Sequence, residues 1–266
     1  MVRILCVQFA QKWRAQWTIW QRVQDIGLCR GEVLLSFDDG PEPDITARLL
    51  DVLQKDDVHV AFCVCGKSVR TAPDLVRRIA SEGHLIVNHG DQHQPLALFS
   101  GHALRKEIQD CDVAIADALA TADFRTEFYR PACGLWTSVV KKVLAQLNKR
   151  ELPVTHFGWD TNVTWYTYRK WIAVTRDAAR RDQGGIFVLH DRRLRFWMES
   201  HYDVNDRKSG ACRGWVPDAA SELIDQLRSD GFTFLDPHVW SRRDLAQPVN
   251  ERLLDPGKFS GQTDPE

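Results

Sequence analysis

Short apolar runs alternate with segments of helical periodicity along this chain from Gly31 onwards. The first run, Val33-Leu34-Leu35, has the continuity of a buried strand, and the segment after it repeats its apolar residues at helical spacing. Such an alternation is typical of parallel βαβ units. Strands are expected at 33–37, 58–64, 84–88, 127–130, 154–159, 185–190 and 232–235, and helices at 44–55, 72–82, 101–120, 137–148, 169–181 and 217–229.

Seven strands are too many for a small two-layer domain and favour a barrel or an open parallel sheet. Because no internal repeat and no linker interrupts the pattern, we expect one domain over residues 31–240. A helical extension at 1–30 precedes it, and a polar tail at 241–266 follows it. Residues 192–215 fit neither period and predict a long loop, rich in Arg, Asp and Trp, near the barrel mouth.

The N-terminal extension carries an aromatic stripe at helical spacing, formed by Phe9, Trp13, Trp17, Trp20 and Val23. The stripe suits either a membrane surface or the main domain, and the second is favoured because aromatic stripes are usually buried. No run of about 18 apolar residues exists, so no spanning helix is expected. Gln8 breaks the first apolar run, which makes a poor signal peptide. We therefore expect a cytoplasmic protein, with peripheral membrane contact through this helix as the alternative.

Charge and cysteine content exclude some classes of function. The 35 Lys and Arg residues nearly balance the 36 Asp and Glu residues, which gives no support for nucleic-acid binding. Seven cysteines scattered over the chain favour reduced thiols. Cys63 and Cys65 share a face of one expected strand, but a single pair does not indicate a metal clip.

Two adjacent carboxylates, Asp38 and Asp39, end the first expected strand just before a Gly40-Pro41 turn. For both to face the barrel mouth, the backbone must leave the strand there. Crowded carboxylates are costly unless a cation or a shared proton separates their charges. Taken alone, the segment fits a surface turn with a helix cap equally well.

A second polar cluster follows the third expected strand. His89 and His93 lie at i and i+4, which places two imidazoles on one side of a turn, as metal sites often require. Alone, they would be two exposed loop histidines. Parallel strands end at the same mouth, however, so this pair is expected to meet the Asp pair. Two neutral histidines and one carboxylate make an open divalent site.

Three further strand ends carry polar residues of catalytic type, namely Arg130, Asp160 and His190. Each has a structural explanation by itself: a surface salt bridge, a helix cap and a core histidine with satisfied hydrogen bonds. Five such strand ends together favour an active site at the mouth.

These segments resemble, in order and spacing, the NodB-homology polysaccharide deacetylases of carbohydrate esterase family 4. The segments that carry the resemblance are Ser36-Phe37-Asp38-Asp39-Gly40-Pro41, Gly83 to His93, Arg130-Pro131-Ala132-Cys133-Gly134, Trp159-Asp160 and Leu189-His190-Asp191. The resemblance covers about residues 31–237 and implies a distorted (β/α)7 barrel.

The resemblance also implies roles for individual residues. Asp39, His89 and His93 would bind a divalent metal, most often zinc in such enzymes, and Asp38 would be the general base. Attack on the acetamide would produce an oxyanion held by the metal and the backbone N–H of Cys133. His190 would protonate the leaving amine, Arg130 would orient Asp38, and Leu189 would line the acetyl pocket. Trp165 and Asp160 are the other expected substrate-binding residues.

The chain departs from the family pattern at three places. Gly90 stands where many members have Ser or Thr, and Pro131-Ala132-Cys133 replaces Pro-Pro-Tyr. The fourth motif usually ends in Asp-Trp, with the Asp expected to tether the arginine, but this chain has Thr164-Trp165. Either Asp160 serves instead or Arg130 is held differently.

The leading hypothesis is metal-dependent N-deacetylation of N-acetylhexosamine units in an oligo- or polysaccharide. A deformylase acting on a lipid-linked sugar, or a cyclic-amide hydrolase, is a second hypothesis on the same scaffold. A non-catalytic glycan- or metal-binding module is the third. The loop at 192–215 is expected to narrow the mouth and favour short substrates.

Overall fold

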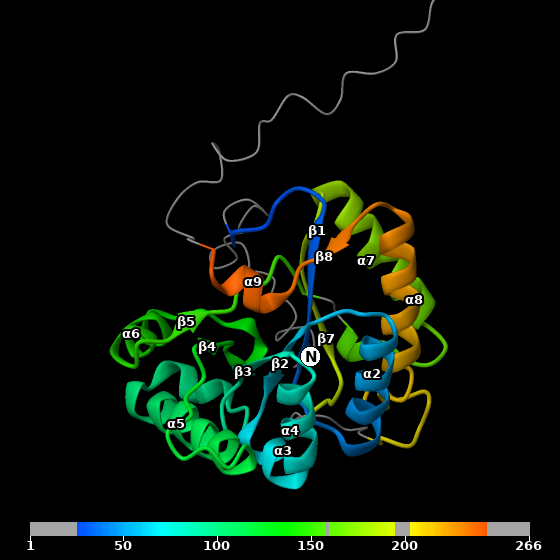
Figure 1. Cartoon of the computed structure of the whole chain (residues 1–266). Helices are drawn as coiled ribbons and strands as arrows, with labels where there is room; N and C mark the ends of the chain where they lie inside the picture. The colour runs from blue at the N-terminus through cyan, green and yellow to red at the C-terminus, as the bar shows by residue number, and fades with distance from the viewer. Residues whose placement is uncertain (1–25, 158–159, 195–202, 244–266) are drawn as a thin grey trace, which may run out of the picture.

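The computed structural model describes residues 26–157, 160–194 and 203–243 (Figure 1). Its strands are β1 (Glu32–Asp38), β2 (Ala61–Val64), β3 (Leu85–Asn88), β4 (Phe128–Tyr129), β5 (Arg150–Glu151), β6 (His156–Phe157), β7 (Gly185–His190) and β8 (Thr233–Phe234). Its α-helices are α2 (Pro43–Lys55), α3 (Gly66–Thr71), α4 (Pro73–Ser81), α5 (Gly101–Ala118), α6 (Ser138–Gln146), α7 (Tyr168–Asp182), α8 (Val216–Ser229) and α9 (Pro237–Ser241). Short 3₁₀ turns are η2 (Pro95–Phe99), η3 (Ala132–Gly134) and η4 (Asp160–Asn162).

The strands form one parallel sheet in the order β5-β4-β3-β2-β1-β7-β6, with β8 also paired to β1. Within the described residues the edge strands β5 and β6 do not pair with each other, so the curled sheet is not closed. Helices α2, α7 and α8 cover one part of it, and α3, α4, α5 and α6 surround the other (Figure 1). The expected distorted (β/α)7 barrel is confirmed.

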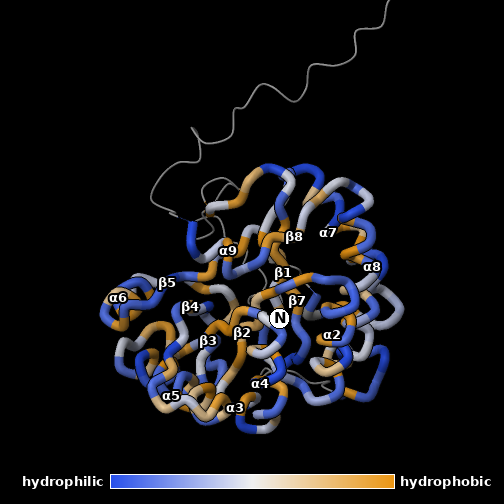
Figure 2. The backbone as a smooth tube through the Cα atoms, viewed as in Figure 1, coloured by the Kyte–Doolittle hydropathy of each residue, from blue (hydrophilic) through white to orange (hydrophobic). Residues whose placement is uncertain are grey.

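Alternating residues of β1 belong to two different buried clusters. Val33, Leu35 and Phe37 pack with apolar residues of the surrounding helices, because successive strand residues point to opposite faces. Leu34 packs on the inner face with Ile26, Leu28 and Trp240 of α9. Apolar residues gather along the central strands and alternate with polar residues along the helices (Figure 2). The folded unit therefore starts before Gly31, since Ile26 and Leu28 are part of its core.

Three elements differ from the expectation. β5 was not expected because Arg150–Glu151 is short, charged and partly exposed. α3 was not expected because its sequence, Gly66-Lys67-Ser68-Val69-Arg70-Thr71, has no apolar periodicity. No helix was expected at the position of α9. Asp236 caps this helix by accepting hydrogen bonds from the N–H groups of His238 and Val239.

Two expectations fall largely outside the described residues. These are the aromatic stripe within the extension 1–30 and most of the polar tail 241–266. The same holds for part of the expected loop, residues 195–202. Within the described residues, no helix combines the length and apolar character needed to cross a bilayer.

Candidate active site

The parallel register brings the polar strand ends together. Asp38 on β1 is aligned with His190 on β7 and with Cys63 on β2. His89 follows β3, on the side of β2 away from β1, and donates its backbone N–H to the carbonyl of Val64. Arg130 follows β4 and donates its backbone N–H to Asn88. All these residues lie at the carboxyl end of the sheet, as the sequence predicts.

The chain leaves β1 at Asp39, as expected for two carboxylates that must both reach the mouth. Asp39 has a φ of 76°, and its N–H donates to the carbonyl of Cys63. A Cβ atom at Gly40 would collide with the carboxylate of Asp191, so only glycine fits there. Asp191 is fully buried and accepts a hydrogen bond of 2.5 Å from Thr46. Burial, with the nearby charge of Asp39, raises the pKa of Asp191 to about 7.

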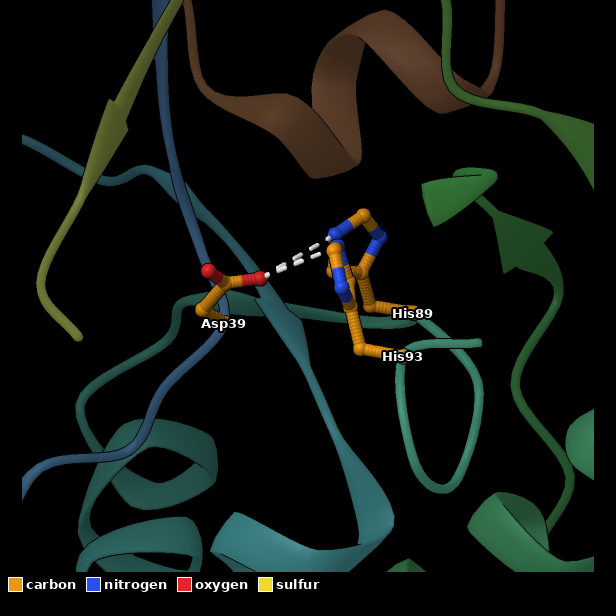
Figure 3. Close-up of side chains that lie close together, drawn as sticks. All are labelled: Asp39, His89 and His93. Carbon is orange, nitrogen blue, oxygen red and sulfur yellow. Dashed lines mark ion pairs between the residues drawn. The ribbon is translucent and has the colours of Figure 1, made fainter. Parts of the chain in front are cut away.

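Asp39, His89 and His93 converge on one point (Figure 3). Oδ1 of Asp39 lies 3.5 Å from Nε2 of His89 and 3.4 Å from Nε2 of His93. This oxygen is buried and has no hydrogen-bond partner within the described part of the chain. The other oxygen, Oδ2, accepts a hydrogen bond of 3.2 Å from the backbone N–H of Leu194. Asp39 therefore presents one free oxygen to the two imidazoles.

These three residues fit a divalent metal. A tetrahedral ion with bonds of about 2.1 Å holds its ligand atoms about 3.4 Å apart. Nδ1 of His89 lies 2.8 Å from the carbonyl of Arg130, to which it donates, so Nε2 keeps its lone pair. Burial lowers the pKa of His93 to about 4 and keeps this imidazole neutral, as a ligand must be. Burial raises the pKa of Asp39, but the electrostatic interaction with His93 and with His89 is larger in sum, so the pKa of Asp39 is lowered.

Asp38 and Arg130 form a buried ion pair beside this point. Nη1 of Arg130 donates to Oδ1 of Asp38 at 2.6 Å and to Oγ of Ser36 at 2.8 Å. Its Nη2 donates to the carbonyl of Pro153 at 3.4 Å. Burial opposes the charge of Arg130, but Asp38 outweighs it and raises the pKa of the guanidinium. The second Asp38 oxygen lies 3.9 Å from Nε2 of His89, so it faces the three-residue cluster.

Asp160 pairs with His190 and not with Arg130, so the second of the two alternatives holds: Arg130 is held differently, by Asp38, Ser36 and the carbonyl of Pro153. Asp160 is fully buried behind His190. Oδ1 of Asp160 lies 2.7 Å from Nδ1 of His190, and Oδ2 accepts the backbone N–H of His190 at 2.8 Å. Burial lowers the pKa of His190, but pairing with Asp160 outweighs it and raises the pKa to about 9. His190 is therefore protonated at neutral pH.

The three remaining expected residues lie in different environments. Cys133 is exposed in η3 and has a φ of 56°. Leu189 is fully buried in a cluster against which Trp165 packs. The guanidinium of Arg207 lies 4.7 Å from the centre of the Trp165 ring. Thr164 bonds to Thr167 at the start of α7, away from Arg130.

Sequence reasoning missed several supporting groups. Ser36 and Asp191 lie in segments that carry the family resemblance, but no role was expected for either, although Ser36 is a polar residue inside an apolar strand. Nothing in the sequence indicated that Arg213 or the N–H of Leu194 would reach the site.

Comparisons with known proteins give the family. The sequence pattern of the family described as polysaccharide deacetylase matches residues 27–181. A chitooligosaccharide deacetylase of Bradyrhizobium sp. (strain ANU 289) is 34% identical over 203 residues, which are 75% of this chain and 86% of that protein. A peptidoglycan-N-acetylglucosamine deacetylase of Bacillus cereus is 26% identical over 235 residues, which are 86% of this chain and 77% of that protein.

Two solved structures share the fold. One, described as a deacetylase with substrate, has a TM-score of 0.63 and 23% identity and covers 81% of this chain and 93% of its own. The other is a family 4 carbohydrate esterase from Streptomyces lividans in complex with acetate. It has a TM-score of 0.59 and 21% identity, and the match covers 77% of this chain and 92% of the esterase chain. On the strength of the sequence match over more than half its length, the chain belongs to the polysaccharide deacetylase family.

Proposed function

We propose that this protein is a metal-dependent amide hydrolase that removes the acetyl group from N-acetylhexosamine units of an oligo- or polysaccharide. One observation carries the proposal: the buried Oδ1 of Asp39, which has no hydrogen-bond partner among the described residues, lies within 3.5 Å of two imidazole nitrogens. An unpaired carboxylate oxygen in this position is costly unless a cation occupies the space between the three groups. The sugar substrate is proposed from the named activities of the relatives.

Asp39, His89 and His93 would hold the divalent ion, with zinc as the expected metal because two imidazoles and one carboxylate suit it. Such an ion supplies Lewis acidity, which polarises a carbonyl oxygen and acidifies water. Asp38 then accepts the proton of the attacking water through the oxygen that faces His89. Arg130 holds the other oxygen of Asp38, so the base stays oriented.

The opposite side of the site handles the leaving group. His190 is held protonated by Asp160 and donates its Nε2 proton to the departing amine. Nδ1 is engaged by Asp160, which leaves Nε2 as the only ring nitrogen available to the substrate. The backbone N–H of Cys133 is the proposed hydrogen-bond donor to the oxyanion that forms at the acetyl carbonyl oxygen when water attacks the carbonyl carbon. By the family resemblance, Leu189 and Trp165 would contribute apolar surface for the acetyl methyl group.

Acetate release from N-acetylglucosamine oligomers of graded length, with zinc, with other divalent ions and after chelation, tests this function. We expect acetate in stoichiometric amounts with free amines, loss of activity on chelation and recovery with added metal. Parallel assays for formate release from N-formylated sugars test the deformylase hypothesis. Binding of the oligomers without release of either acid would support the glycan-binding module instead.

A further inference from the structure

Arg213 is a buried cation in the segment between β7 and α8, and it contacts Asp160. Its side chain is almost fully buried, and the residue is 3% exposed. Nη1 donates a hydrogen bond of 2.7 Å to the backbone carbonyl of Asp160. The same nitrogen lies 3.7 Å from the carboxylate oxygen Oδ2 of Asp160. The guanidinium therefore contacts both the backbone and the side chain of the residue that holds His190.

The surroundings of Arg213 leave it little freedom. Its guanidinium carbon lies 5.5 Å from the centre of the Trp215 ring. Trp215 is fully buried, stacks on Tyr168 and meets the edge of Trp171. Nε and Nη2 of Arg213 have no hydrogen-bond partner in the described part of the chain. Burying a cation is costly unless an opposite charge compensates it, and the carboxylate of Asp160 lies 3.7 Å from Nη1.

The two contacts act on different parts of Asp160. The bond to the carbonyl anchors the peptide at the start of η4, from which the Asp160 side chain extends. The charge of Arg213 favours the ionised carboxylate, and burial, which opposes ionisation, is outweighed by His190 and Arg213 together. Both oxygens of this carboxylate are committed to His190, one to Nδ1 and one to the backbone N–H. Any shift of Asp160 would therefore move the imidazole.

We propose that Arg213 is a positioning residue for the general acid: it fixes Asp160 and, through it, the orientation of His190. This inference rests on the proposed function for the role of His190 in protonating the leaving amine. It extends that role to a three-residue chain, Arg213–Asp160–His190, whose outermost member, Arg213, lies in none of the sequence segments that carry the family resemblance.

A comparison of two acetyl substrates tests the proposal. An amine leaves an amide only when protonated, whereas p-nitrophenolate leaves its acetyl ester without a proton. Arg213→Met should lower kcat for deacetylation of an N-acetylglucosamine oligomer at least about tenfold, while hydrolysis of p-nitrophenyl acetate stays within about twofold. Arg213→Lys, which keeps a positive donor, should recover part of the loss. Equal losses on both substrates would show a merely structural role and overturn the proposal.

Arg48→Met is the matched control. Arg48 donates to the carbonyl of Gly214, the residue after Arg213, and has no contact with Asp160 among the described residues. If anchoring the segment were the only effect, Arg48→Met would change the ratio of the two rates as much as Arg213→Met. We expect it to leave the ratio unchanged. Circular dichroism and thermal unfolding show whether each variant is folded. If Arg213→Met is not folded, Arg213→Lys takes its place in the comparison of the two substrates.

Proton NMR gives a readout that needs no turnover. The Nδ1 proton of His190, bonded to Asp160 at 2.7 Å, should appear as a downfield resonance in protein labelled with ¹⁵N-histidine. We expect this resonance in the wild type and in Arg48→Met, and its loss or broadening in folded Arg213→Met. An unchanged resonance would contradict the proposal. If the wild type hydrolyses neither substrate, the proposed function fails, and the resonance still decides the structural part of this inference.

Discussion

Oδ1 of Asp38 accepts a 2.6 Å hydrogen bond from Nη1 of Arg130, and both side chains are buried beside the cluster of Asp39, His89 and His93. Because of this pairing, the two adjacent carboxylates have different partners. Asp38 is paired with the cation of Arg130, whereas Oδ1 of Asp39 has no hydrogen-bond partner in the described part of the chain and is open to an ion. This difference leads to the first three predictions.

Asp38→Asn should abolish deacetylation and leave the metal bound. The amide keeps the shape of the side chain but has no basicity, so we expect a loss of about a hundredfold or more in kcat. Acetate release measures the rate, and elemental analysis of the purified variant measures the metal. Turnover close to that of the wild type would rule out Asp38 as the base.

His89→Ala should lose the metal, because one of the three converging ligand atoms is removed. Elemental analysis after dialysis against buffer without metal should show a sub-stoichiometric content, and activity should fall with it. His102→Ala, which removes an exposed histidine of α5, is the control and should keep full occupancy. Full occupancy in His89→Ala would contradict the ligand set.

Arg130→Met should destabilise the fold by about 3–5 kcal/mol, because it leaves the buried charge of Asp38 without its partner. Urea unfolding monitored by fluorescence gives this free energy. Combining Arg130→Met with Asp38→Asn should recover part of the loss, since the double variant has no buried unpaired charge. Additive losses would show that the two residues do not interact.

Activity should fall as the pH rises through about 9. His190 acts as an acid only when protonated, and its pairing with Asp160 raises its pKa to about 9 against the effect of burial. Asp160→Asn removes the raising charge, so the alkaline limb of kcat/KM should move to lower pH. A pH–rate profile of both proteins checks the direction. An unmoved limb would mean that another group titrates there.

Acid should destabilise the protein partly through His84, which lies far from these groups in a buried position next to His59. Burial, and secondly His59, lowers the pKa of His84 from 6.5 to about 4, so the folded state holds the neutral ring. The unfolded chain binds the proton more readily. The contribution of His84 to the free energy of unfolding is therefore fully present above pH 6.5 and is lost as the pH falls towards 4.

His84→Asn should weaken this pH dependence while keeping the acceptor for the Val60 N–H, which now bonds to Nδ1 of His84 at 3.3 Å. Urea midpoints at pH 7 and pH 5 measure the effect in both proteins. We expect a smaller difference between the two midpoints in the variant. Equal differences in variant and wild type would assign the acid sensitivity to other groups.

The strand ends were predictable because their chemistry is local and their meeting point is topological. Parallel strands gather their carboxyl ends at one mouth, so Asp39, His89 and His93 could be expected together before any distance was known. The apolar runs likewise located β1, β3 and β7, whose interiors are continuously buried. β5, which is charged, two residues long and partly exposed, left no such pattern.

The sequence by itself thus determined the parallel barrel and which polar residues meet at its mouth, because periodicity and position after a strand are properties of neighbouring residues. Only the tertiary structure decided which polar groups pair. Asp160 holds His190, 30 residues away, and not Arg130. Ser36 serves Arg130 across 94 residues, and the N–H of Leu194 reaches Asp39 across 155. Such pairings depend on the register and curl of the sheet, where a shift by one residue turns each side chain to the opposite face.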